Sequence, residues 1–195
     1  MTNLLSAWYL NTKHFEPFVY IEDAFTDEEC ERIKKYCSKL SLDFAKVGYR
    51  QQNNTIRSNK IAWINEEDDI SEWLYRKLTD LITHINTEFW KFDLEYIATL
   101  QYTKYDSIGD NYNYHLDIMN QGNSYRKLSF SLQLDDDDSY EGCNLIIKTN
   151  SENYTANRKK GSINFFPSFI LHKVTPLEKG VRNCIVGWVC GPNFK

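Results

Sequence analysis

The chain has 195 residues, of which 42% are hydrophobic and 15% aromatic, and its formal net charge is −4. This composition is too apolar for a disordered chain, and the length suits one globular domain with a substantial core. The negative charge argues against a fixed basic surface for duplex DNA or for an acidic membrane.

The cysteines and the N-terminus bear on the compartment. There are five cysteines and no CxxC motif, so we expect neither a secreted disulfide framework nor a zinc cluster. The N-terminal residues lack the basic and apolar regions of a signal peptide. No apolar run approaches the ~20 residues of a membrane helix. We therefore expect a reduced, cytoplasmic location without a membrane partner.

The first half of the chain predicts mainly helices. Residues 19–40 read as a short strand, a turn and a helix, with Thr26 and Glu29 spaced as a capping box. The polar stretch 43–60 has no clear period and predicts a loop or an irregular hairpin. Residues 68–90 carry apolar side chains at spacings of three and four, which predicts a second helix.

After residue 90 the pattern becomes that of short strands separated by turn-rich pieces. The predicted strands are 96–105, 127–134, 143–148, 162–167 and 183–190. The run DDDD at 135–138 could bind a metal ion, but a solvated turn is the better interpretation. Two early helices before many strands predict a single α+β domain over 1–195, with helical support at about 18–90 and a β-sandwich or jelly-roll core at about 91–195.

The stretch YHLD at 114–117 is the first candidate for chemistry. In a strand, residues i and i+2 point to the same face, so His115 and Asp117 would converge while Leu116 faces away. One imidazole and one carboxylate would then form half of a metal site. Alone this motif is weak, because HxD often occurs by chance.

A second half of such a site lies further along the chain. If the chain folds back about Leu177, His172 lies opposite Arg182, and directly opposed residues share a face. Taken separately, a buried hydrogen-bonded His172 and a surface Arg182 would be the simpler interpretations.

Together these residues have a chemical logic. Two histidines and one carboxylate occupy one face of an octahedral ion, an arrangement that suits non-haem Fe(II), whereas zinc is the alternative. Zinc hydrolysis has no need of an arginine at a fixed distance from the ligands. A dicarboxylate co-substrate does, because a guanidinium binds a carboxylate through two hydrogen bonds.

The same residues resemble the 2-oxoglutarate- and Fe(II)-dependent oxygenases of the prolyl 4-hydroxylase type, over roughly residues 18–190. The family pattern is HxD, a distal His some fifty to sixty residues later, and Arg or Lys about ten residues beyond. The segment GSINFFPSFILHKVTP also matches, and YEGCNLIIK resembles a GGxL segment in which Cys143 replaces the second glycine. The resemblance implies a double-stranded β-helix, or jelly roll, with N-terminal supporting helices.

The resemblance also implies ligands for the cofactor and the co-substrate. His115, Asp117 and His172 would be the catalytic iron ligands, and Arg182 would hold the distal carboxylate of 2-oxoglutarate. Tyr105 would contact the same molecule, with Tyr102 as the alternative and a core aromatic residue as the simpler interpretation. Ascorbate is an accessory reductant that the resemblance allows.

Further residues are assigned to the substrate side and to the cavity wall. Trp188 lies where relatives carry a pocket tryptophan, and Cys184 stands where some relatives carry serine. Arg57 is a candidate substrate residue, although a solvated loop is the better interpretation of its segment. Trp188, Phe165 and Leu171 are expected to form an apolar wall.

The implied reaction uses O2 to hydroxylate a substrate carbon and releases succinate and CO2. The resemblance favours a prolyl side chain in a protein or peptide. The alternatives are a hydroxylase or demethylase of a small molecule or a nucleic acid, and a non-catalytic binding domain. The complete ligand set argues against a non-catalytic domain, and the negative net charge argues against nucleic acid.

Overall fold

The structure is a computed structural model, and it describes residues 15–45, 56–121, 124–149 and 152–194. Two antiparallel sheets form most of it. The larger sheet has the order β1 (Val19–Ile21), β12 (Ile163–Pro167), β8 (Ser124–Gln133), β15 (Arg182–Gly191), β5 (Leu100–Tyr105), β3 (Lys60–Ile64) and β2 (Asp43–Phe44). Two short strands extend it, because β4 (Tyr96–Ile97) pairs with β15 and β7 (Asn120–Gln121) pairs with β8.

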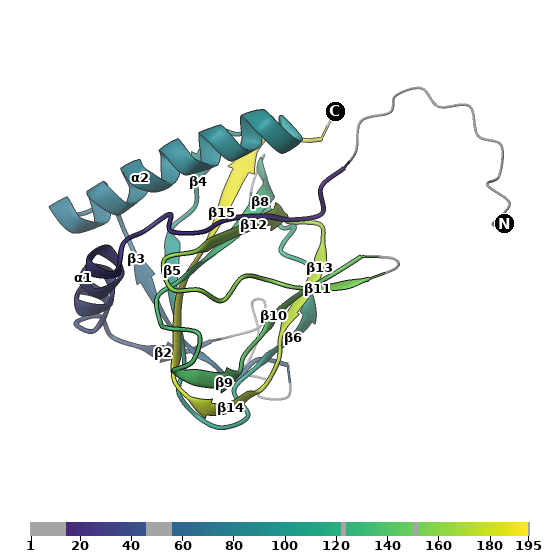
Figure 1. Cartoon of the computed structure of the whole chain (residues 1–195). Coiled ribbons are helices and arrows are strands. Elements are labelled where there is room, and N and C mark those ends of the chain that lie inside the picture. The colour runs from purple at the N-terminus through teal and green to yellow at the C-terminus, as the bar shows by residue number, and fades with distance from the viewer. Residues whose placement is uncertain (1–14, 46–55, 122–123, 150–151, 195) are drawn as a thin grey trace, which may run out of the picture.

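The smaller sheet contributes the other half of the core. Its order is β11 (Asn153–Thr155), β10 (Leu145–Lys148), β13 (Leu171–Val174) and β6 (Tyr112–His115). A separate pair, β14 (Leu177–Gly180) and β9 (Tyr140–Gly142), closes one end. Figure 1 shows the smaller sheet on the side of the larger sheet that faces away from the helices. The described residues therefore have a mostly antiparallel, jelly-roll-like fold.

Two helices precede most of these strands. Helix α1 (Asp27–Cys37) begins at a complete capping box, in which Thr26 and Glu29 exchange hydrogen bonds as the sequence predicted. Helix α2 (Asp69–Ile85) is capped by Asp68 and continues into a π-helical turn, η1 (Asn86–Trp90). Within the residues described, no helix is both long and apolar enough to cross a bilayer.

Both helices lie against the outer face of the larger sheet (Figure 1), and a large apolar cluster joins them to it. Cys30 and Ile33 of α1 and Leu74 and Leu78 of α2 pack against fully buried strand residues such as Leu132. A second cluster fills part of the space between the two sheets. All five cysteines are buried free thiols.

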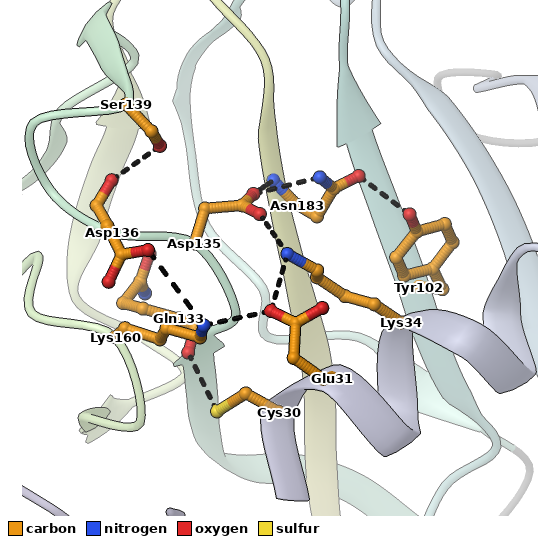
Figure 2. A network of polar contacts seen from close by, with 10 residues as sticks. All are labelled: Cys30, Glu31, Lys34, Tyr102, Gln133, Asp135, Asp136, Ser139, Lys160 and Asn183. Atoms are coloured by element: carbon orange, nitrogen blue, oxygen red, sulfur yellow. Dashed lines mark hydrogen bonds and ion pairs between the residues drawn. The ribbon is translucent and has the colours of Figure 1, made fainter. Parts of the chain in front are cut away.

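The predicted strands after residue 90 are present, with shifted ends, but shorter strands were missed. The missed strands include β3 and β6. Both are short, and buried and exposed residues do not alternate regularly along them. The irregular hairpin is confirmed at the ends of the 43–60 stretch, where β2 pairs with β3, while residues 46–55 lie outside the described residues. The interpretation of DDDD as a solvated turn is wrong for Asp135, which is 8% exposed and accepts hydrogen bonds from Lys34 and Asn183 (Figure 2).

The residue that replaces a glycine, Cys143, lies in the left-handed region with φ of 48°. A side chain is strained there, whereas glycine is not. Its thiol is nevertheless fully buried and points toward the carbonyl oxygen of Asp110. The backbone at position 143 would therefore suit a glycine better than any residue with a side chain.

We predict that Cys143→Gly is more stable than Cys143→Ala by at least ~0.5 kcal/mol, because both variants lose the thiol but only alanine keeps the strained backbone. Urea unfolding midpoints of the two variants measure this difference directly. An alanine variant as stable as the glycine variant would contradict a left-handed backbone at this position.

Candidate active site

Three potential metal ligands come together at the edge of the smaller sheet. His115 ends β6 and lies directly opposite His172 of β13 in the antiparallel register. Asp117 follows β6, and its backbone N–H donates to the carbonyl oxygen of Ser168. Its carboxylate oxygens lie 3.6 Å from Nε2 of His115 and 3.3 Å from Nε2 of His172. Strand register therefore joins residues that are far apart in the sequence.

Hydrogen bonds orient both imidazoles. Nδ1 of His115 lies 2.7 Å from the carbonyl oxygen of Asn113, and Nδ1 of His172 lies 2.9 Å from that of Ile170. A carbonyl oxygen can only accept, so each Nδ1 carries the proton and donates it. The lone pair of each ring is then on Nε2, which faces Asp117, as a metal ligand requires.

Burial and proximity determine the charges of the three side chains. Burial, with the neighbouring His172, lowers the pKa of His115 to about 4, so this ring is neutral at physiological pH. Burial alone would raise the pKa of Asp117, but the two imidazoles beside it hold that pKa well below its usual range. The site therefore presents a carboxylate and a neutral imidazole in a buried setting.

These side chains fit a divalent transition metal. Two imidazole nitrogens and a carboxylate oxygen lie within 4.8 Å of one another, and they are the single group of three or more potential ligands found in the part of the chain that is described. Ligands at adjacent positions around an ion with bonds of about 2.1 Å would lie roughly 3 Å apart, close to the spacing seen. Fe(II) and zinc both suit this donor set.

A cavity of about 640 Å³ lies between the sheets and contains all three ligands in its wall. The four other candidate residues from the sequence also line it; they are Arg57, Tyr105, Arg182 and Trp188. The smaller sheet and the loop after β6 supply the ligands, whereas β5 and β15 of the larger sheet supply Tyr105, Arg182 and Trp188. The cavity is thus built by both sheets.

The prediction that His172 and Arg182 face each other across a hairpin is wrong. His172 pairs with β6 and β10 in the smaller sheet, whereas Arg182 pairs with Tyr105 of β5 in the larger sheet. Strand β14, which contains Leu177, pairs with β9 and carries the chain from one sheet to the other. The two residues still meet in one cavity because the sheets stack face to face.

Arg182 is 2% exposed, and one of its nitrogens lacks a partner. Its Nε and Nη2 both donate to the side-chain oxygen of Gln133, at 3.2 and 2.9 Å. Its Nη1 is buried with no hydrogen-bond partner. A buried, charged donor without an acceptor is costly, so this nitrogen indicates a place for an anion.

The two tyrosine candidates lie on opposite faces of β5. Tyr105 is directly opposite Arg182, lines the cavity and is 3% exposed. The side chain of Tyr102 belongs to the cluster under the helices, and its hydroxyl donates to the side-chain oxygen of Asn183. The side-chain period of two along a strand separates them, so of this pair only Tyr105 can reach a molecule in the cavity.

The interpretation of Arg57 as part of a solvated loop is wrong. Arg57 is 8% exposed, and its guanidinium donates to the side-chain oxygens of Asn59 and Gln101, each at 2.7 Å. Its guanidinium carbon also lies 4.4 Å from the ring centroid of Tyr112. Arg57 is therefore held in the cavity wall by these contacts.

The expected apolar wall needs a correction. Trp188 lines the cavity, but Phe165 points into the cluster under the helices and packs on Phe130, and Leu171 lies outside the cavity lining. The neighbouring strand residue Phe166 takes the expected place, with its ring centroid 4.6 Å from that of His172. The alternation of side chains along β12 accounts for the exchange.

Sequence reasoning missed two residues of the site. Arg126 of β8 lines the cavity, and its guanidinium carbon lies 3.8 Å from the ring centroid of Trp188. Gln133, on the same strand, holds Arg182 from behind. A signal was available, because Ser129, Ser131 and Gln133 alternate with large apolar residues and so mark a polar inner face.

Comparisons with known proteins agree with this geometry. No family model matches the chain. A PKHD-type hydroxylase of Synechococcus sp. (strain CC9605) is 42% identical over 84 residues, which are 43% of this chain and 38% of the relative. A PKHD-type hydroxylase of Aliarcobacter butzleri (strain RM4018) is 25% identical over 178 residues, 88% of this chain and 77% of the relative. The chain spans less than half the length of the first curated relatives it matches.

Solved structures show the same fold at low identity. A Pseudomonas putida prolyl-4-hydroxylase superposes with a TM-score of 0.74 at 19% identity, covering 91% of this chain and 94% of the other. A Trichoplax adhaerens prolyl hydroxylase, in complex with a hypoxia inducible factor peptide fragment, also gives 0.74, at 18% identity and 89% and 83% coverage. The resemblance inferred from the sequence is thereby confirmed: the chain is similar in sequence to PKHD-type hydroxylases and has the fold of prolyl 4-hydroxylase-like 2-oxoglutarate and Fe(II) oxygenases.

Proposed function

We propose that this chain is an Fe(II)- and 2-oxoglutarate-dependent dioxygenase that hydroxylates a prolyl side chain in a protein or peptide. One observation carries the proposal. A buried arginine with an unpartnered Nη1 shares a cavity with a His-Asp-His ligand set. A metal and an anion can therefore bind in one cavity, and a 2-oxo dicarboxylate is a molecule that would use both sites.

Each cofactor has a fitting set of side chains. His115, Asp117 and His172 would hold Fe(II), while Arg182 and Tyr105 would hold the distal carboxylate of 2-oxoglutarate. When bound, the iron supplies the activation of O2 that couples the conversion of 2-oxoglutarate to succinate and CO2 with hydroxylation of the substrate. Zinc fits the same ligands, but a zinc hydrolase would leave Arg182 without a function.

The protein's part is to position and to shield. The backbone carbonyls behind the two imidazoles keep their Nε2 atoms directed at one point, and Asp117 stays ionised between them. Phe166 and Trp188 make part of the wall apolar, which limits the access of water. The hydrogen bonds from the imidazoles to the backbone carbonyls orient the ligands before a metal binds.

Two observations support a prolyl side chain as the substrate. Both solved structures described above are prolyl hydroxylases, and one was solved with a peptide fragment. Trp63, 49% exposed, and Trp188 pack against each other in the cavity wall and offer apolar surface to a prolyl ring. A small molecule or a nucleic acid remains the alternative substrate.

We further infer that residues 1–195 form one catalytic domain with a double-stranded β-helix core. Support comes from the apolar cluster that joins both helices to the larger sheet, which makes a separate helical domain unnecessary. The use of ascorbate and a cytoplasmic location remain predictions from the sequence.

We predict that replacing any one of His115, Asp117 and His172 by alanine abolishes stoichiometric Fe(II) binding, because two donors seldom retain the ion. Metal content after anaerobic reconstitution and gel filtration measures the effect. His84→Ala, on the exposed face of α2, is the control and should retain iron. Full iron retention by any of the three site variants would contradict the ligand assignment.

We predict that Arg182→Ala weakens 2-oxoglutarate binding while the iron content stays unchanged. Loss of one member of a buried, charge-assisted pair costs ~2–5 kcal/mol, or about 30- to several-thousand-fold in affinity. Arg182→Lys should lose less, since it keeps the charge without the planar fork. An alanine variant with the affinity of the wild type would rule out this role.

We predict that the iron-loaded enzyme, given 2-oxoglutarate and O2, adds one oxygen atom to proline in a peptide substrate. Mass spectrometry of proline-rich peptides and of host-cell proteins, with succinate measured in parallel, is the test. Peptide modification without added 2-oxoglutarate would contradict the mechanism. Succinate formation coupled only to a free metabolite would transfer the assignment to the alternative substrate class.

A further inference from the structure

Gln133 holds Arg182, one of the three arginines in the described part of the chain that line the cavity. Both Nε and Nη2 of Arg182 donate to its side-chain oxygen, and Gln133 itself is 3% exposed and outside the cavity lining. We propose that Gln133 is a positioning residue that directs Nη1 of Arg182 into the cavity and, because it is uncharged, leaves the positive charge of Arg182 for the distal carboxylate of 2-oxoglutarate. This inference rests on the function proposed above.

The orientation of the Gln133 amide is determined by its other contacts. Its Nε2 donates to the carbonyl oxygen of Ser131 at 3.3 Å and to the hydroxyl oxygen of Ser131 at 3.0 Å. The reversed amide would place an NH2 group against the guanidinium, and two donors cannot bond to each other. The oxygen of Gln133 must therefore face Arg182.

No carboxylate pairs with Arg182 among the residues that the structure describes. Within the described parts of the chain, its hydrogen-bond acceptor is this neutral amide rather than a carboxylate. Burial raises the pKa values of the neighbouring Tyr105, Tyr140 and Cys184, so these groups are uncharged at physiological pH. A buried guanidinium paired only with neutral groups favours the entry of an anion.

A network on the other side of the sheet fixes the two strands that carry this pair (Figure 2). Asp135, just after β8, accepts from the backbone N–H and from the side-chain amide of Asn183, the residue after Arg182. Lys34 of α1 donates to Asp135 at 3.0 Å, and the thiol of Cys30 points toward the backbone oxygen of Gln133. Helix α1 therefore holds the ends of β8 and β15 together.

The register then places the two side chains next to each other. Cys184 lies directly opposite Gln133, so Arg182, two residues earlier, is its diagonal neighbour on the same face. Diagonal neighbours are within reach of long side chains. The backbone is held by α1 and the Gln133 amide by Ser131, so the two hydrogen bonds from Gln133 fix the plane of the Arg182 guanidinium.

The substitution Gln133→Glu tests the role of the neutral amide, since glutamate keeps size and acceptor but neutralises Arg182. With Mn(II) in place of iron, calorimetry should show a loss of at least ~30-fold in affinity for 2-oxoglutarate. Affinity for 2-oxopentanoate, which has a methyl group in place of the distal carboxylate, should stay within about threefold. A purely structural defect would weaken both ligands and the metal alike.

Gln101→Glu is the matched control. Gln101 is also buried on the larger sheet, and its oxygen accepts from Arg57 at 2.7 Å, so the same change is made against a different arginine of the same cavity. This variant should bind 2-oxoglutarate within about threefold of the wild type. A loss equal to that of Gln133→Glu would mean that any added negative charge in the cavity is sufficient, and would overturn the specific role of Gln133.

Gln133→Met distinguishes the effect of losing the hydrogen-bond acceptor from the effect of adding a charge. It also tests the proposal if the glutamate variant fails to fold. Methionine removes the acceptor without adding charge, so we expect a loss of about 3- to 10-fold, smaller than for glutamate. Wild-type affinity in both variants would overturn the proposal. Failure of the wild type to prefer 2-oxoglutarate over 2-oxopentanoate would instead overturn the proposed function.

Discussion

The stacking of two antiparallel sheets face to face is the constraint on which the site depends. One sheet carries the metal ligands, and the other carries the arginine, so neither sheet contains a site by itself. The distance between them is maintained by apolar side chains at one end and by the β9–β14 pair where the chain crosses over. The cavity therefore exists because the core between the sheets is filled only in part.

The charged side chains of this cavity have partners that leave their charges available to a metal and an anion. Asp117 is flanked by two imidazoles. Each imidazole donates its Nδ1 proton to a backbone carbonyl, so the Nε2 lone pairs and the carboxylate of Asp117 face the same place, where a metal can bind. Arg182 is held by a neutral amide oxygen instead of a carboxylate. Full ion pairing within the protein would make the site more stable and less able to bind a metal and an anion.

The helices contribute to the site although neither lines the cavity. Helix α1 reaches Asp135 through Lys34, and Asp135 in turn holds the backbone beside Arg182 (Figure 2). An acidic run that the sequence favours as a solvated turn thus includes a buried anchor. Contacts on the outer face of the larger sheet hold the ends of β8 and β15, and these strands position Gln133 and Arg182 on the inner face.

The sequence by itself determined the ligand types, their spacing, the strand-rich second half and the capped first helix. These features are local, because a capping box or an HxD pair in extended chain acts over a few residues. The position of Arg182 was also anticipated, but for a wrong reason, since the expected hairpin is absent. The spacing of the ligands and Arg182 predicts that Arg182 shares the site, whereas the expected strand pairing does not occur.

Only the tertiary structure decided which strands pair and which sheet each joins. Pairing between strands far apart in the chain depends on the whole hydrophobic core, which no short pattern encodes. That pairing places His172 opposite His115. It directs Tyr105 and Phe166 into the cavity, and Tyr102 and Phe165 into the cluster under the helices. It also brings Gln133 beside Arg182, a contact between positions 49 residues apart that neither residue's own neighbourhood in the sequence predicts.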